Sequence, residues 1–121
     1  MYRKLPRSSD QVLGYAIEGR ITQDEVEQMQ AEIGEAMERH GSTRLLARIE
    51  GMEDVEPSAV WQDMKMVPEY TRHVQRAAVV GDRRWQEWAT RLADVFAEAR
   101  YFETGDEEQA WAWLRENGKP A

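Results

Sequence analysis

Residues 12–49 decide the fold, and they read VLGYAIEGRITQDEVEQMQAEIGEAMERHGSTRLLARI. Within this stretch, residues 21–41 have apolar side chains at every third or fourth position, which is the period of an α-helix. These side chains are Val26, Met29, Ile33 and Met37. Thr22 and Glu25 have the spacing of a capping box, and Gly41 is the residue type that ends a helix in the left-handed conformation. The stretch therefore predicts an amphipathic helix between two strands.

Short apolar runs predict the strands, and they alternate with helical patterns. Strands are expected at residues 2–5, 12–17, 44–49, 77–80 and 99–102. Further helices are expected to start at Pro57, at Asp82 and at Thr104, where Thr104 and Glu107 repeat the capping-box spacing. The order β-β-α-β-α-β-α-β-α predicts one α/β domain, residues 1–121, built on a single mixed, mainly parallel sheet with four β/α units.

The two faces of this sheet are expected to differ. One face carries bulky apolar side chains, and the other carries small or charged residues, namely Gly14, Ala16, Glu18, Arg48 and Arg100. A parallel sheet that is covered by helices on both faces needs two apolar faces. We therefore expect most helices to pack on one face, and the other face to be thinly covered or used as the contact of a homodimer.

Composition and charge exclude several functions. The 121 residues include no cysteine, which excludes disulfides, thiolate catalysis and thiolate metal sites. A net charge of −7 disfavours nucleic-acid binding, and the longest apolar run is far shorter than the roughly 20 residues of a membrane span. The basic N-terminal residues lack the apolar stretch of a secretory signal, so the expected location is the cytoplasm. Without a glycine-rich phosphate loop, no cofactor is expected.

Several segments of the sequence resemble the SpoIIAA-like family, which is related to STAS and CRAL-TRIO domains. They are VLG at residues 12–14, EGRIT at 18–22, WQDMK at 61–65, AAVVGDRRW at 77–85, RYF at 100–102 and AWAWL at 110–114. The most specific of them is the Val-Val-Gly-Asp-x-x-Trp element at 79–85. The resemblance implies a β/α sheet with helices mainly on one side. It also implies relatives that act as phosphorylatable regulatory switches or carry apolar ligands, although a fold does not fix a function.

A candidate ligand site lies where the strand at 77–80 gives way to a helix. Open α/β sheets bind ligands at the carboxyl ends of their strands. Gly81 would let a ligand approach the backbone, and Arg83 and Arg84 would supply positive charge at a helix N-terminus. The alternative is structural, because Asp82 is a common helix N-cap residue. The frequency of such caps favours this alternative.

Two tryptophans extend the candidate site. Trp61 and Trp85 each begin a predicted helix, and right-handed crossovers bring such helix starts to the same sheet edge. We expect them to border a cavity for an apolar or amphipathic ligand, together with Met52, Met64 and Lys65. The alternative is that these aromatic side chains are ordinary core residues, as Trp85, Trp88 and Trp113 are expected to be.

Ser58 is a weak candidate for phosphorylation. It follows Pro57 near a predicted helix start, which is about where STAS regulatory switches carry their serine, and a helix dipole would favour phosphate there. The acidic residues before it would repel phosphate, which favours an ordinary first-turn serine. His40 and His73 have no partner at metal-ligand spacing, so neither a metal site nor a catalytic constellation is expected.

Two functions follow from these patterns. The first is a non-enzymatic regulatory or binding module that holds a small apolar or amphipathic ligand near the carboxyl ends of the strands. The second is a STAS-type partner-switch domain that binds other proteins through its surface or through a homodimer. An internal apolar pocket would favour the first, and a flat contact surface would favour the second.

Overall fold

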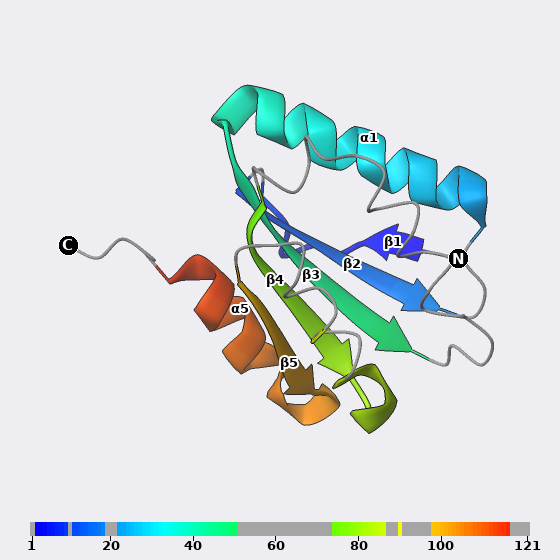
Figure 1. Cartoon of the computed structure of the whole chain (residues 1–121), viewed down its shortest axis with the longest axis vertical. Helices are drawn as coiled ribbons and strands as arrows, with labels where there is room; N and C mark the ends of the chain where they lie inside the picture. The colour runs from blue at the N-terminus through cyan, green and yellow to red at the C-terminus, as the bar shows by residue number, and fades with distance from the viewer. Residues whose placement is uncertain are drawn as a thin grey trace.

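A five-stranded sheet organises the chain, in the spatial order β1-β2-β3-β4-β5 (Figure 1). The computed structural model describes residues 2–9, 11–18, 22–50, 74–86, 90 and 98–116. Strand β1 runs antiparallel to β2, and all other neighbours are parallel. The bounds of the strands are β1 Tyr2–Lys4, β2 Val12–Glu18, β3 Thr43–Glu50, β4 Val74–Gly81 and β5 Ala99–Glu103. The predicted mixed, mainly parallel sheet is confirmed.

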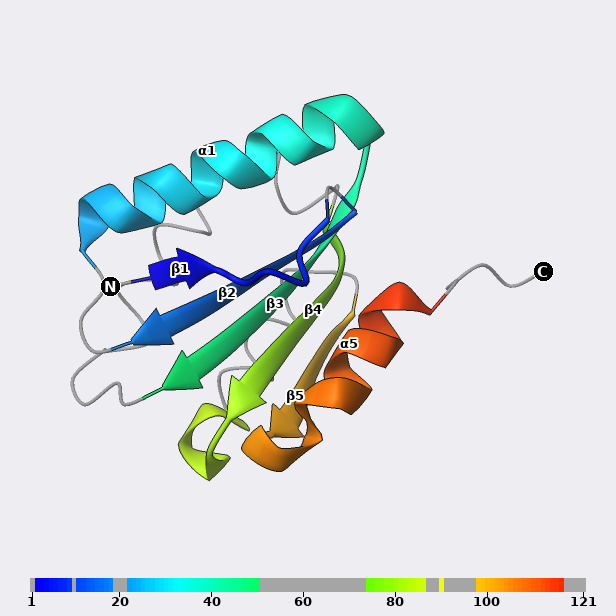
Figure 2. The same ribbon diagram turned by 180° about the vertical axis from the view of Figure 1, so that it is seen from behind.

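Two described helices pack on opposite faces of the sheet. Helix α1 (Gln23–His40) lies on one side, and helix α5 (Glu107–Arg115) lies on the other, as Figures 1 and 2 show. Short 3₁₀ turns follow β4 and β5, namely η1 (Arg83–Trp85) and η2 (Thr104–Asp106). The helix predicted to start at Pro57 lies outside the described residues, as does most of the helix predicted after Asp82 and with it Trp88. A majority of helices on one face therefore stays a prediction.

Both ends of α1 form as the sequence predicts. The Thr22 side chain accepts a hydrogen bond from the Glu25 N–H, and the Glu25 side chain accepts one from the Thr22 N–H, which completes the capping box. At the other end, Gly41 adopts φ 78°, and its N–H donates to the Met37 carbonyl. The helix is thus closed by residues within its own sequence.

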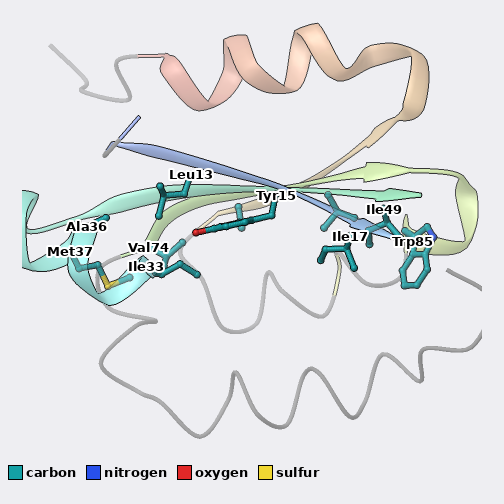
Figure 3. Packing of buried hydrophobic residues seen from close by; sticks show 11 residues of the cluster. Leu13, Tyr15, Ile17, Ile33, Ala36, Met37, Ile49, Val74 and Trp85 are labelled. Atoms are coloured by element: carbon teal, nitrogen blue, oxygen red, sulfur yellow. The ribbon is translucent and has the colours of Figure 1, made fainter. Parts of the chain in front are cut away.

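The α1 face of the sheet is filled mainly by large strand side chains (Figure 3). Helix α1 contributes a smaller set of side chains to this cluster. From the strands come Leu13, Tyr15, Ile17, Ile49, Val74 and Val79; from α1 come Ile33, Ala36 and Met37. Trp85 packs at the far end of the same cluster, beside Ile17 and Ile49 (Figure 3). These large strand side chains form the bulky apolar face that the sequence predicts.

The opposite face is not open, which corrects the expectation of a thinly covered face. Its small strand residues, Gly14, Ala16 and Ala78, lie beneath α5, whose Trp111 is fully buried. A Cβ atom added at Gly14 would overlap Trp111 Cη2 and would lie 2.8 Å from Cζ2. The small residues therefore make room for an indole ring, and this face loses its role as the basis for a homodimer contact.

The second predicted capping box, Thr104 with Glu107, is wrong. Residues Thr104–Asp106 form the 3₁₀ turn η2, and α5 begins after Asp106 without a side-chain cap. The Glu107 carboxylate faces the sheet, where it accepts hydrogen bonds from Arg48 and from the Trp111 indole. A charged partner on the sheet thus competes successfully with the local cap.

Candidate functional site

The candidate site lies at the carboxyl edge of the sheet, where the four parallel strands end. Glu18 ends β2, Glu50 ends β3, Gly81 ends β4 and Glu103 ends β5. Register pairs Glu18 with Glu50 and Gly81 with Glu103. The edge that generally binds ligands in such sheets therefore carries several carboxylates here.

The turn after β4 brings four of the predicted site residues together. Trp85 folds back over the strand end: its backbone N–H donates to the Asp82 carbonyl at 3.1 Å, and the residue is only 5% exposed. Its Cδ1 atom lies 3.0 Å from the position that a Cβ atom would take on Gly81. The Tyr101 hydroxyl donates to the Gly81 carbonyl at 2.9 Å. The absence of a side chain at Gly81 thus lets the Trp85 indole approach the strand end.

Charge at this edge is mixed, with carboxylates prevailing near β5. Asp82 and Arg83 are exposed, and both act electrostatically on the Tyr101 hydroxyl, as Glu103 does. Burial raises the pKa of the Tyr101 hydroxyl, and the charges of Glu103 and Asp82 raise it further, while Arg83 opposes them. Beside β5, an acidic head group would meet the guanidinium of Arg83 together with the carboxylates of Glu103, Asp82 and Asp106.

The remaining predicted site residues are not placed by the structure. Met52, Ser58, Trp61, Met64 and Lys65 lie outside the described residues, and so does the side chain of Arg84. The cavity predicted between Trp61 and Trp85 therefore stays a prediction, and so does modification of Ser58. What the structure brings together is the single turn from Gly81 to Trp85.

A polar cluster beneath the N-terminal end of α5 was not predicted. Arg48 Nη1 lies 3.2 Å from both carboxylate oxygens of Glu107. Its buried Nε lies 2.8 Å from Glu50 Oε1, an ion-pair contact without hydrogen-bond alignment. The Trp111 indole N–H donates to the same Glu107 at 3.2 Å. The cluster thus satisfies the polar atom of the buried indole.

Two arginines hold the other end of α5. Arg44 and Arg76 are register partners on β3 and β4. Arg44 Nη1 donates to the Leu114 carbonyl at 2.6 Å and also to the Glu116 carbonyl. Arg76 Nη1 donates to the Trp113 carbonyl at 2.6 Å. These donors satisfy carbonyls at the negative end of the helix. Burial lowers the pKa of Arg44, as does the neighbouring Arg76 charge.

Four guanidinium groups flank the two tryptophans of α5. Arg7 and Arg115 lie 5.1 and 5.3 Å from the Trp111 ring centroid. Two others lie against Trp113: Arg76 at 5.0 Å and Arg100 at 5.1 Å. For the two strand arginines, Arg76 and Arg100, the alternation along β4 and β5 is a sequence signal of this face, and the structure shows that the face is covered by α5.

On the α1 side, Glu25 links β1 to the helix. Its Oε2 accepts a hydrogen bond from the Tyr2 N–H at 2.9 Å, and its Oε1 accepts one from Thr22. Burial alone would raise the pKa of Glu25, but the N–H donors of Thr22 and Tyr2 outweigh it and lower the pKa. Nearby, the Tyr15 hydroxyl donates to Glu32 Oε2 at 2.9 Å, and burial with this bond raises the Tyr15 pKa.

Two general features bear on the kind of site. Within the described ranges, no three His, Asp or Glu side chains gather closely enough to hold a metal ion. Among the same residues, no helix is both long and apolar enough to cross a membrane.

Comparison with known proteins defines the class. A family model described as SpoIIAA-like matches residues 12–115, and the chain therefore belongs to the SpoIIAA-like family. The fold is similar to the crystal structure of an uncharacterized protein of the DUF3478 family from Shewanella loihica PV-4, which has a SpoIIAA-like fold. The two chains are 27% identical, each is covered to 93%, and the TM-score is 0.59. No curated protein matches the sequence.

Proposed function

We propose that this protein is a regulatory domain that acts by binding another protein through its surface, and not by catalysis. Membership of the SpoIIAA-like family supports a regulatory, protein-interaction role in general. The observation that carries the proposal is the use of the inward-facing arginines. Arg44, Arg48 and Arg76 point from the sheet toward α5, and all three bind groups of this helix, so their charges serve the fold.

Recognition by the outer surface follows from how the described faces are packed. Helix α1 packs on one face of the sheet and α5 on the other, each against a buried apolar cluster. A partner would therefore contact exposed side chains and sheet edges. A homodimer, formed by a contact other than the face under α5, and the cytoplasmic location expected from the sequence remain part of this proposal.

Native mass spectrometry of the purified protein tests the proposal most simply. We expect the bare chain or small assemblies of it, with no bound small molecule of constant mass. A co-purifying ligand present in a fixed ratio, which survives desalting and is lost on unfolding, would contradict a purely surface-based function. The same spectrum reports the oligomeric state.

An amphipathic ligand at the carboxyl edge is the second candidate function. It is favoured by Trp85, which places an indole at this edge beside Ile17 and Ile49 (Figure 3). Titration with a fatty acid, followed by tryptophan emission, tests it against a cationic amphiphile of equal chain length as the control. A saturable change that disappears in Trp61→Leu, with the melting temperature unchanged, would support this function. No change with either amphiphile would exclude it.

A further inference from the structure

Strand β5 forms an edge of the sheet. It pairs with β4, and in the part of the chain that the structure describes no strand lies on its other side (Figure 2). The Ala77 N–H donates to the Glu98 carbonyl, and Ala77 is the register partner of Ala99. Backbone groups alternate along a strand, so Ala99, Tyr101 and Glu103 direct their N–H and C=O groups away from β4. The edge therefore offers a template for another strand.

The side chains of β5 are suited to such a contact. Tyr101 and Phe102 are both only partly buried, and they lie on opposite faces of the sheet: Tyr101 on the α1 face and Phe102 on the α5 face. Phe102 packs against Trp113 at 5.9 Å between ring centroids, and the exposed Arg100 lies over the same indole. Aromatic and arginine side chains of this kind often dominate protein interfaces.

We propose that β5 pairs antiparallel with β5 of a second copy, with Tyr101 on the two-fold axis. In this register each outward-directed residue faces another: Tyr101 faces its own copy, and Ala99 faces Glu103. Arg100 faces Phe102 on the α5 face, which places a cation beside an aromatic ring. The contact is isologous, as a closed dimer requires, and it joins two sheets into one.

Neighbouring registers are less favourable. Shifting the pair by one step toward the start of the strand places Arg100 opposite Arg100, and like charges directly opposite are destabilising. Shifting it the other way places Tyr101 opposite Glu103 and leaves Ala99 and Arg100 without partners in the facing strand. The proposed register pairs all five residues of β5.

The contact is small, so we expect a weak dimer. Five residues a side is well below the roughly 20–30 residues of a standard stable interface. This inference deepens the association part of the proposed function, but it does not depend on any ligand. A chain that stays monomeric would refute the β5 contact, whereas recognition of a different protein would still stand.

Single cysteines test the register, because the chain has none of its own. Tyr101→Cys would place two thiols across the axis, with Cα atoms about 5.5 Å apart, within the range that a disulfide accepts. Glu103→Cys is the matched control on the same strand and face, since its two copies would lie about 13 Å apart along the strands. A mixture of the Ala99→Cys and Glu103→Cys variants gives a second test of the register, because these two positions face each other across the dimer. This test leaves Tyr101 in place.

Under mild oxidation, we expect Tyr101→Cys to form a covalent dimer at least about tenfold faster than Glu103→Cys, because pairing raises the effective thiol concentration. The mixed pair is expected to give mainly the heterodimer. Circular dichroism and melting temperature confirm that each variant is folded. Equal rates for both single variants, no preference for the heterodimer, or monomers by sedimentation at hundreds of micromolar would each overturn the proposal.

Discussion

The two faces of the sheet differ in where their largest side chains come from. On the α1 face the strands supply the bulk, through Leu13, Tyr15 and Ile17, and the helix contributes residues as small as Ala36. On the α5 face the strands combine large residues such as Leu46 with small ones at Gly14, Ala16 and Ala78, and the helix adds two indole rings, Trp111 and Trp113. Close packing requires only that the two layers be complementary in volume. Small residues at a few strand positions can therefore make room for a large side chain from the covering helix.

The helices also differ in what satisfies their ends. Helix α1 closes its own ends with Thr22, Glu25 and Gly41, all of which are near in sequence. Helix α5 depends on the sheet: Arg48 binds Glu107 at its start, and Arg44 and Arg76 bind carbonyls at its end. One helix is specified locally and the other by tertiary contacts.

Removal of the Trp111 ring is expected to have the largest effect. Trp111→Ala should lower the free energy of unfolding by about 3–5 kcal/mol, as is usual when a buried large aromatic side chain is truncated. On the α1 face, Ile33→Val should cost only about 0.5–1.5 kcal/mol. Urea unfolding measures the free energy of unfolding of both variants, provided that the dependence on urea concentration has the same slope in each. A loss below about 1 kcal/mol for Trp111→Ala would mean that this ring does not fill the α5 face.

Adding a methyl group at one glycine on each face should show which face is packed more tightly. Gly14→Ala introduces a Cβ atom into the space of a fully buried indole, so overpacking should cost about 1–3 kcal/mol. Gly81→Ala, on the α1 face, has its closest contact at 3.0 Å from Trp85 and should cost less. Denaturant midpoints report both variants. A larger loss of free energy of unfolding for Gly81→Ala than for Gly14→Ala would contradict the tighter packing of the α5 face.

Loss of one arginine under α5 should have a moderate effect. Arg76→Met keeps most of the stem but removes the donor to the Trp113 carbonyl, which should cost about 1–2 kcal/mol. Arg3→Met is the control, since it breaks only an exposed ion pair with Glu18 and should cost about 0–1 kcal/mol. Equal costs for the two variants would show that the sheet arginines do not anchor α5.

The smallest effect concerns the pH dependence at the start of α1. The carboxylate of Glu25 is hydrogen-bonded in the folded state and its folded pKa is lowered, so its contribution is complete above the unfolded pKa and is lost as pH falls through the folded pKa. Thr22→Ala removes the hydroxyl donor and should move the pKa of Glu25 back upward. An NMR titration of the Glu25 carboxyl measures this shift, and an unchanged pKa would contradict it.

Local signals predicted the fold well. The capping box at Thr22 and the stop at Gly41 depend on residues a few positions apart, which a single sequence shows directly. The strand residue Gly14 was a signal of close approach, but its partner Trp111 is far along the chain, and nothing local identifies it. The Thr104–Glu107 spacing predicted a capping box that does not form, because Glu107 binds Arg48, which is distant in sequence and lies on β3.

The candidate site was predicted in part. The turn from Gly81 to Trp85 is local, and the sequence correctly placed it at the carboxyl edge. Its chemistry depends on neighbours from other strands, such as Tyr101 and Glu103, whose positions the sequence alone does not give. The sequence alone also does not show that Gly81 leaves room for the Trp85 indole.

A double-mutant cycle between Gly14 and Trp111 tests the central claim, that the small strand residues make room for the α5 indole. Trp111→Phe removes the ring atoms that a Cβ at position 14 would overlap. The account predicts that Gly14→Ala costs at least about 1 kcal/mol less in the Trp111→Phe background than in the native chain. Additive costs, agreeing within about 0.5 kcal/mol, would contradict it.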